Sequence, residues 1–170
     1  MRRLETPSPP AWRSRRARSL RRYNTSLYQW AYYVTTASNA SGSASLTVSF
    51  ADSLPTGGIT IVDQVQIAGN DTSNPIVTSN EKVTNLSSGT ATANLPSAPG
   101  TQDATLAFLS GAGDFGASAP LGSPAMTNAF YNHQGAGTMD IVYALAGAQN
   151  ESFTFPSQFW GTIALEIKHG

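Results

Sequence analysis

The stretch FWGTIALEI (residues 159–167) carries the clearest structural signal in the chain. Its residues divide into two alternating sets, Trp160, Thr162, Ala164 and Glu166 against Phe159, Ile163, Leu165 and Ile167. Successive side chains of a β-strand point to opposite faces, whereas those of a helix repeat every 3.6 residues. The alternation therefore predicts a β-strand.

Similar strand patterns recur upstream, separated by clusters of Gly, Pro, Asn, Asp and Ser. The segments are 27–36, 45–50, 59–68, 90–95, 103–110, 127–133, 138–146 and 151–155. Within 59–68, Asp63 shares a face with the isoleucines, a mismatch that indicates a bulge or a strand end. The dense turn signal GNDTSNP (69–75) predicts a loop, and GAGDFGASAPLGSPAM (111–126) predicts the longest one.

No segment shows a convincing helical period. Short strands spaced by turns are typical of antiparallel sandwiches and jelly rolls. We therefore expect an all-β protein, an antiparallel, jelly-roll-like β-sandwich over residues 23–170, preceded by a basic N-terminal arm or linker over residues 1–22. The arm shows no sustained period and is not expected to form a packed element.

The charge of the chain is divided unevenly along its length. Eight of its ten basic residues lie before residue 23: Arg2, Arg3, Arg13, Arg15, Arg16, Arg18, Arg21 and Arg22. With Glu5 they give the arm a formal charge of +7, while two lysines and nine acids give the remainder −7. The formal net charge of zero hides this asymmetry.

Composition excludes several classes of protein. The chain has no cysteine, which rules out disulfides, thiolate chemistry and cysteine-ligated zinc. It contains no apolar run of 18 residues, so no membrane-spanning helix is expected. The basic start is not followed by an apolar stretch, and no signal peptide is readable. Charged residues make up only 12%, about half the usual share, and Ala, Ser, Thr, Gly and Asn replace them, as in many extracellular and virion β-proteins.

Residues 27–168 resemble a β-sandwich module that recurs in secreted bacterial proteins and in phage structural proteins. The resemblance rests on five stretches in a fixed order: LYQWAYYVTTASNASGSASLTVSF, ITIVDQVQIAGNDTSNPIV, ATANLPSAPGTQDATLAFLSGAG, GAGTMDIVYALAG and FWGTIALEIK. It implies a non-catalytic, accessory or structural role and supplies no catalytic residues. Such modules usually have further strands before the aromatic one, and PSPPAW (7–12) resembles the proline–tryptophan turn found there.

The inventory for catalysis is small. Only His133 and His169 could serve as a general base near neutral pH, and a serine nucleophile would depend on His133. No nucleophile elbow, phosphate-binding loop or H-E-x-x-H motif occurs. We therefore expect no enzyme activity and no cofactor.

Asn70, Asp71 and Asn74 form the one weak candidate for a metal site. Their side-chain oxygens are the hard ligands that Ca²⁺ prefers. A full shell would need ligands from another loop, and the favoured alternative is that these side chains cap a turn.

Aromatic residues raise the hypothesis of a carbohydrate site. Trp30, Tyr32 and Trp160 are the candidates for rings that stack on a sugar. The commoner fate of such residues is burial in a core.

The arginine arm has three interpretations. It binds nucleic acid through salt-dependent phosphate contacts, or it docks on the acidic body of a neighbouring chain, or it is an accident of the start site. The sequence leaves all three open.

The sequence thus predicts a non-enzymatic structural protein of a phage-like virion or extracellular assembly, such as a decoration, head-fibre or tail component. Its expected partners are further copies of itself or other virion or surface proteins, with nucleic acid as a partner of the arm. The alternative is a carbohydrate-binding accessory module with exposed aromatics and a glycan ligand. Either function places the protein in a virion or outside the cell.

Overall fold

The fold is described from a computed structural model, whose described residues are 15–19, 30–33, 61, 63, 65–84, 87–116, 122, 123, 125–135 and 137–170. This part of the chain contains nine β-strands and no helix. It accordingly holds no helix that could cross a membrane. The predicted all-β class is confirmed.

The strands follow one another along the chain as short extended segments. They are β1 (Arg15–Ser19), β2 (Trp30–Tyr33), β3 (Ile76–Val83), β4 (Ser88–Asn94), β5 (Ala104–Gly111), β6 (Thr127–Gln134), β7 (Gly137–Ala144), β8 (Asn150–Gln158) and β9 (Trp160–Ile167). Those from β4 onward lie within one or a few residues of the predicted segments.

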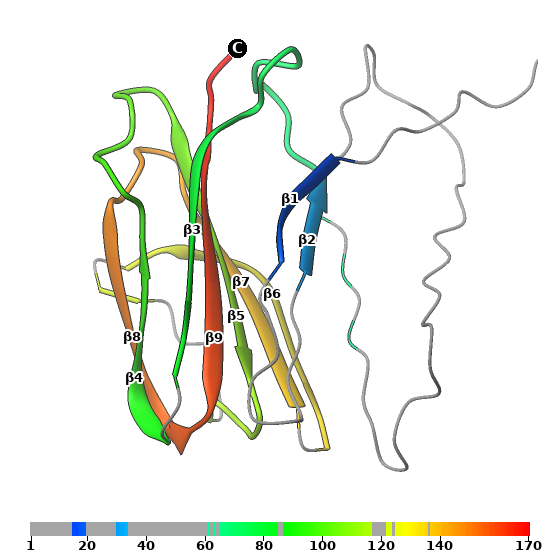
Figure 1. Cartoon of the computed structure of the whole chain (residues 1–170), viewed down its shortest axis with the longest axis vertical. Coiled ribbons are helices and arrows are strands. Elements are labelled where there is room, and N and C mark those ends of the chain that lie inside the picture. The colour runs from blue at the N-terminus through cyan, green and yellow to red at the C-terminus, as the bar shows by residue number, and fades with distance from the viewer. Residues whose placement is uncertain are drawn as a thin grey trace, which may run out of the picture.

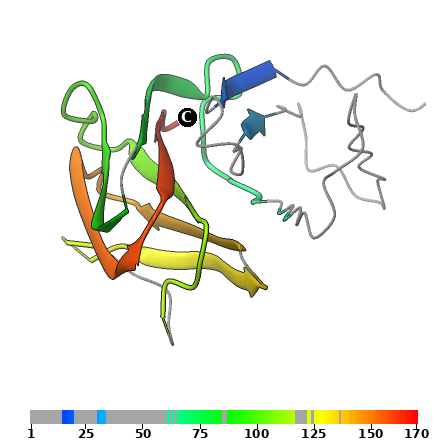
Figure 2. The ribbon, with the colours of Figure 1, turned by 60° about the horizontal axis from the view of Figure 1, so that its bottom comes forward.

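The described strands form three antiparallel sheets. The largest has five strands in the order β3-β9-β5-β7-β6, and two smaller sheets consist of β4-β8 and β1-β2. The β4-β8 sheet lies beside one face of the five-stranded sheet, and β1-β2 lies beyond the other side (Figures 1 and 2). A sandwich is therefore present, but the arrangement does not establish a jelly roll.

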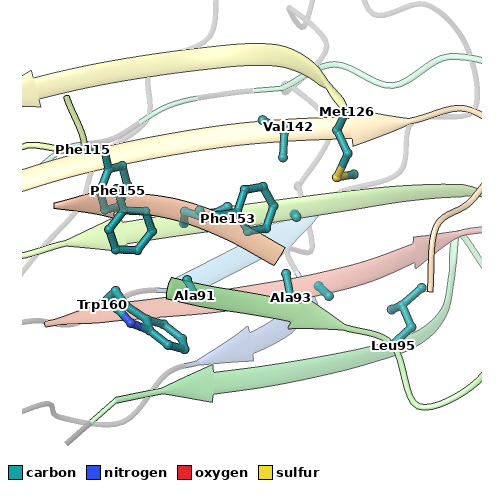
Figure 3. Packing of buried hydrophobic residues seen from close by; sticks show 12 residues of the cluster. Ala91, Ala93, Leu95, Phe115, Met126, Val142, Phe153, Phe155 and Trp160 are labelled. Atoms are coloured by element: carbon teal, nitrogen blue, oxygen red, sulfur yellow. The ribbon is translucent and has the colours of Figure 1, made fainter. Parts of the chain in front are cut away.

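An inner cluster of apolar side chains joins the two larger sheets. It contains Ala91, Ala93, Leu95, Ala107, Leu109, Phe115, Met126, Val142, Phe153, Phe155, Trp160 and Ala164. Figure 3 shows Phe153 and Phe155 of β8 between the two layers, Phe153 near Val142 and Met126 and Phe155 beside Phe115. Alanines on β4 face these large rings, so small and large side chains interlock across the layers.

An outer cluster covers the opposite face of the five-stranded sheet. Its buried members are Ala31, Leu106, Ile141, Ile163, Leu165 and Ile167. Ala31 belongs to β2, and its contact with this cluster places the small β1-β2 sheet against the outer face. All eight residues of β9 are consequently buried, with Trp160 and Ala164 on the inner side and Ile163, Leu165 and Ile167 on the outer side.

The five-stranded sheet and the β4-β8 sheet are joined along one side by side chains. Thr162 of β9 donates to the Thr92 carbonyl at 2.8 Å, and Asn80 of β3 donates to the Asn94 carbonyl at 2.9 Å. The Lys82 ammonium donates to the Thr92 hydroxyl at 2.8 Å. The bonds from Thr162 and Asn80 give two backbone carbonyls of β4 hydrogen-bond partners, although no strand pairs with that side of β4 in the described chain.

Strand β3 was not expected from the sequence. Its stretch IVTSNEKV has a polar centre and one charge of each sign, and most of its side chains are only half-buried. This composition suits an edge strand, where charges discourage pairing with other chains. The alternation test misses such a strand because it requires a buried face.

The strand expected at 59–68 is wrong for the residues described there. Positions 61, 63 and 65–68 belong to no strand. Val65 packs against the outer cluster, so its apolar side chain is partly buried without its backbone belonging to a strand. The strand expected at 45–50 lies outside the described residues.

The arm was expected to be free of packed elements, and this is wrong for Arg15–Ser19. These residues pair antiparallel with Trp30–Tyr33, with a bulge between Arg16 and Arg18. Pairing gives the backbone groups of both segments hydrogen-bond partners. The sequence of the arm does not reveal this strand, because it has no alternation of apolar side chains.

We predict that two leucines of opposite burial differ sharply in their contribution to stability. Leu109 is 0% exposed in the inner cluster, and Leu145 is 75% exposed. Leu109→Ala should lower the free energy of unfolding by about 2–5 kcal/mol, through lost burial and a residual cavity. Leu145→Ala should change it by less than about 0.5 kcal/mol.

Urea unfolding followed by circular dichroism measures both variants. Equal destabilisation by the two substitutions would contradict the assignment of Leu109 to the core.

Candidate functional site

The polar side chains of the sandwich gather beneath the loop that joins β5 to β6. The Tyr131 hydroxyl donates to the Asp114 carboxylate at 3.1 Å and to the Gly116 carbonyl at 2.9 Å. The Gln158 amide donates to the Asp114 carbonyl at 2.8 Å. These bonds fix residues 112–116 on β6 and β8, as predicted for a loop rather than a regular element.

At the base of the same loop, two side chains lie close to the backbone of Gly111. A Cβ at Gly111 would lie 2.5 Å from both Gln158 Oε1 and Phe115 Cε1. The Phe115 ring in turn lies 4.5 Å from that of Phe155, centroid to centroid. Glycine at 111 therefore lets an aromatic ring of the loop enter the inner cluster.

Hydrogen bonds and burial shift the pKa values of Asp114 in this loop and of Tyr131 on β6. The Gly116 amide and the Tyr131 hydroxyl hold the pKa of the Asp114 carboxyl below its ordinary value. Burial, together with the hydrogen bond to Asp114, raises the pKa of Tyr131 to about 12. His133 adds a contact of 2.9 Å from Nδ1 to the Thr138 hydroxyl, which also donates to the Gly113 carbonyl. His133 thus helps to hold the loop, and its ring is engaged in a structural contact.

Asp140 is a carboxyl group inside the sandwich. It is 0% exposed on β7, on the face that Val142 turns toward the β4-β8 sheet. The Asn128 amide donates to Oδ1 at 2.6 Å, while Oδ2 is buried without a described partner. Burial raises the pKa of Asp140 to about 7, although the bonds from Ile141 and Asn128 oppose this.

Glu151 is a second interior carboxyl group, on β8. It is 1% exposed, and neither of its carboxyl oxygens has a hydrogen-bond partner in the described chain. Burial raises the pKa of Glu151 to about 7. Both carboxyls are enclosed, so neither is placed to exchange a proton with a substrate at the surface.

These two acids were missed at the level of sequence, although a signal existed. In ESFTF, Glu151 has the same parity as Phe153 and Phe155, which places it on the apolar face of the strand. In MDIVYA the residues of both faces are apolar apart from Asp140, which indicates a strand covered on both sides and therefore a buried Asp140.

The residues proposed as weak calcium ligands lie in a turn, and calcium binding there stays a prediction. Asp71 Oδ1 accepts the amides of Ser73 at 2.8 Å and Asn74 at 3.2 Å. Its Oδ2 lies 2.7 Å from the Lys168 ammonium, and the Asn70 side chain donates to the Asp71 carbonyl. The Lys168 bond and the two amides lower the pKa of Asp71 to about 2. The carboxylate is thus occupied by the turn and by the last strand, as the capping interpretation requires.

This turn also anchors the end of the sequence. The Asp71 amide donates to the Lys168 carbonyl at 2.9 Å and the Gly170 amide to the Gly69 carbonyl at 2.8 Å. The His169 amide donates to the Asp103 carboxylate at 2.9 Å. The backbone of His169, the other candidate general base, is therefore bonded to Asp103 and bridged to Asn70.

Of the aromatic candidates, Trp160 lies inside the protein. It is 4% exposed, belongs to the inner cluster, and has Lys82 Nζ 6.0 Å from its ring centroid (Figure 3). Its ring is not available as a platform for sugars. Trp30 and Tyr32 lie on β2, paired with Ser19 and Arg16, and their side chains are outside the described structure. A glycan site at these two residues stays a prediction.

The arginines of the arm are placed only in part. Arg15, Arg16 and Arg18 lie on β1, and the other five lie outside the described residues. Binding of a partner by the arm also stays a prediction.

Comparison with known proteins adds no relative. No family model matches the chain, and no curated protein or solved structure matches it either.

We predict that the stability of the protein falls as the pH rises from about 5 to about 7. In this range the unfolded Asp140 carboxyl is ionised while the folded one stays protonated, so the unfolded state binds fewer protons and is favoured by higher pH. The loss should level off above the folded pKa. Its size for Asp140 should be on the order of 2–4 kcal/mol.

Asp140→Asn should reduce the slope of this dependence in urea unfolding at a series of pH values and leave the part that Glu151 contributes. Asp71→Asn is the matched control, because Asp71 titrates at about pH 2 and should leave the dependence unchanged. The interpretation fails if Asp140→Asn retains the full wild-type slope.

Proposed function

We propose that the protein is a non-enzymatic structural subunit of a phage-like virion or extracellular assembly, and that it self-associates through the free edge of β6. The proposal rests on one observation, that the edge strands differ in how well they are protected from pairing with another chain. Of the four edges of the five-stranded sheet and the β4-β8 sheet in the described chain, those of β3, β4 and β8 are covered or interrupted, whereas no strand pairs with the outer side of β6.

Three edges have a recognisable protection. The carbonyls of β4 accept side chains of β3 and β9. On β8, Ser152 forms an isolated bridge with Ser123 of the long loop, and Pro156 removes one backbone donor. Strand β3 carries Glu81 and Lys82 and lies close to β1. Charges, proline and covering segments are the devices that prevent unwanted edge pairing.

Strand β6 has less protection: the Asn128 amide donates to the Phe130 carbonyl at 3.1 Å beside the irregularity at residue 129, but no charge, proline or covering strand is described on its edge. Its eight residues, TNAFYNHQ, include no lysine, arginine, acid or proline, and the first three are exposed. A strand edge with free backbone groups is a template for another strand. A second copy of β6 fits this edge, because two antiparallel copies satisfy each other's backbone groups in a closed two-fold contact.

The buried acids change the interpretation of the charge asymmetry. Asp140, Glu151 and Glu166 are at most 3% exposed. The formal −7 of the body therefore overstates the negative charge that its surface offers to a neighbour's arm. This favours an external polyanion such as nucleic acid as the partner of the arm, over the acidic body of another copy.

We predict that Ala129→Lys weakens self-association. Ala129 is exposed on β6 at the irregularity between Asn128 and Phe130, where it has no register partner on β7. A lysine there adds a charge to the edge, which should be costly to bring against a second copy. Light scattering and sedimentation should show smaller particles with an unchanged circular dichroism spectrum.

The matched control is Thr154→Lys, which adds the same charge to an exposed residue on the face of β8. It should assemble as the wild type does. A wild-type protein that is monomeric at all concentrations would remove the basis for the proposal.

For the arm, we predict that deleting residues 1–14 lowers nucleic-acid retention and keeps the fold. The deletion removes Arg2, Arg3 and Arg13 but leaves β1 paired with β2. Each lost phosphate contact should reduce the slope of log affinity against log salt by about 0.7–0.9. Binding of a fluorescent oligonucleotide at several salt concentrations measures it, and an unaltered slope would speak against the arm as the binding element.

A further inference from the structure

Glu151 lies beneath the end of the loop that leads into β6. A Cβ at Gly122 would stand 3.1 Å from Glu151 Oε2 and 2.9 Å from Phe153 Cε1, so the loop backbone rests directly on these two side chains. Gly122 has a φ of +83°, a conformation that favours glycine. The next residue, Ser123, is bridged to Ser152, the immediate neighbour of Glu151 on β8.

The loop continues from this contact into the inner cluster. Met126 is 4% exposed and packs in the same cluster as Phe153 and Val142 (Figure 3). Closure of Gly122, Ser123 and Met126 over β8 therefore encloses the Glu151 carboxyl, and the carboxyl in turn forms part of the surface on which they rest.

We propose that Glu151 and the segment formed by Gly122, Ser123 and Met126 are an acid-closed latch. The segment stays seated on β8 while the Glu151 carboxyl is neutral, and ionisation of that carboxyl releases it. The driving force is desolvation, because a carboxylate with two unpartnered buried oxygens gains its hydration only when the segment lifts.

Cations do not compensate this carboxylate in the described structure. Strands β4 and β5 contain no titratable side chain. Titratable groups on the other strands that bear on the sandwich interior are Glu81, Lys82, Tyr131, His133, Asp140 and Glu166. Lys82 donates to Thr92, His133 contacts Thr138, and Glu166 accepts the Gly100 amide at 3.0 Å. Burial without an opposing charge is also the cause of the raised pKa of Glu151.

The direction of the pH effect follows from the two states of the latch. With the segment lifted, Glu151 should titrate at its ordinary pKa of 4.5, and with the segment seated at about 7. Between these values the open state loses its proton first, so the open fraction rises by up to roughly tenfold for each pH unit. Above the higher value both states are ionised and the open fraction levels off. Opening would also uncover the β8 edge at Ser152, but the latch itself does not depend on self-association.

Hydrogen exchange of the full chain tests the proposal. Exchange in the peptide containing residues 122–126, corrected for the intrinsic pH dependence of exchange, should accelerate by roughly tenfold or more between about pH 5 and about pH 7. Amides of the central strand β5, which exchange through global unfolding, should instead follow the pH dependence of global stability, in which Asp140 takes part. In Glu151→Gln, which keeps the shape of the neutral acid, the rise should disappear.

Asp140→Asn is the control, because it removes the other interior acid and leaves Glu151. It should retain the rise in residues 122–126. Loss of the rise in Asp140→Asn but not in Glu151→Gln would overturn the assignment to Glu151.

The wild-type protein provides a second measurement if Glu151→Gln does not fold. Infrared spectra should contain a band of protonated carboxylic acid near neutral pH that persists in Asp140→Asn, where Glu151 remains, and it should vanish over the pH range in which the Met126 methyl resonance shifts. A wild-type spectrum without a protonated acid at about pH 6, above the ordinary carboxyl range, would exclude the latch. So would exchange in residues 122–126 that is independent of pH.

Discussion

The rest of the structure depends on the burial of β9 on both of its faces. One face meets the aromatic side chains of β8 and the alanines of β4, and the other meets the outer cluster to which Ala31 of β2 contributes. A single strand thus holds both apolar layers together. Because β9 pairs with β3 and β5, the ladders on both sides position the remaining strands relative to it.

Burial of the two carboxyl groups of Asp140 and Glu151 changes the electrostatics of the sandwich. The side chains that fasten the loop before β6 are hydrogen-bonded, whereas within the described residues Asp140 has a partner on one carboxyl oxygen and Glu151 on neither. Enclosed acids without a cation favour their neutral form. The same burial that completes the core is therefore expected to make the protein most stable at mildly acidic pH, and it removes negative charge from its surface.

The proposed assembly edge and the proposed latch lie at the same end of one connection, where the loop between β5 and β6 enters β6. The long loop ends at β6, whose outer edge has no strand partner in the described chain, and on the way it covers part of β8 at Ser152. An event that lifts the loop alters the exposure of β8 and the entry to β6 together. Edge pairing and pH are therefore expected to be coupled in any assembly that forms through these strands.

The sequence by itself determined the all-β class and the strands from β4 to β9, because alternation of apolar side chains is a local property that directly reflects strand geometry. It also determined the turn at Asp71, where an acid bonds to amides two and three residues away. Only the tertiary structure decided that Arg15–Ser19 pairs with β2, that IVTSNEKV is a strand, and that Trp160 is enclosed. Each of these depends on a partner far along the chain, and the burial that raises the pKa of Asp140 and Glu151 arises only when the two sheets meet.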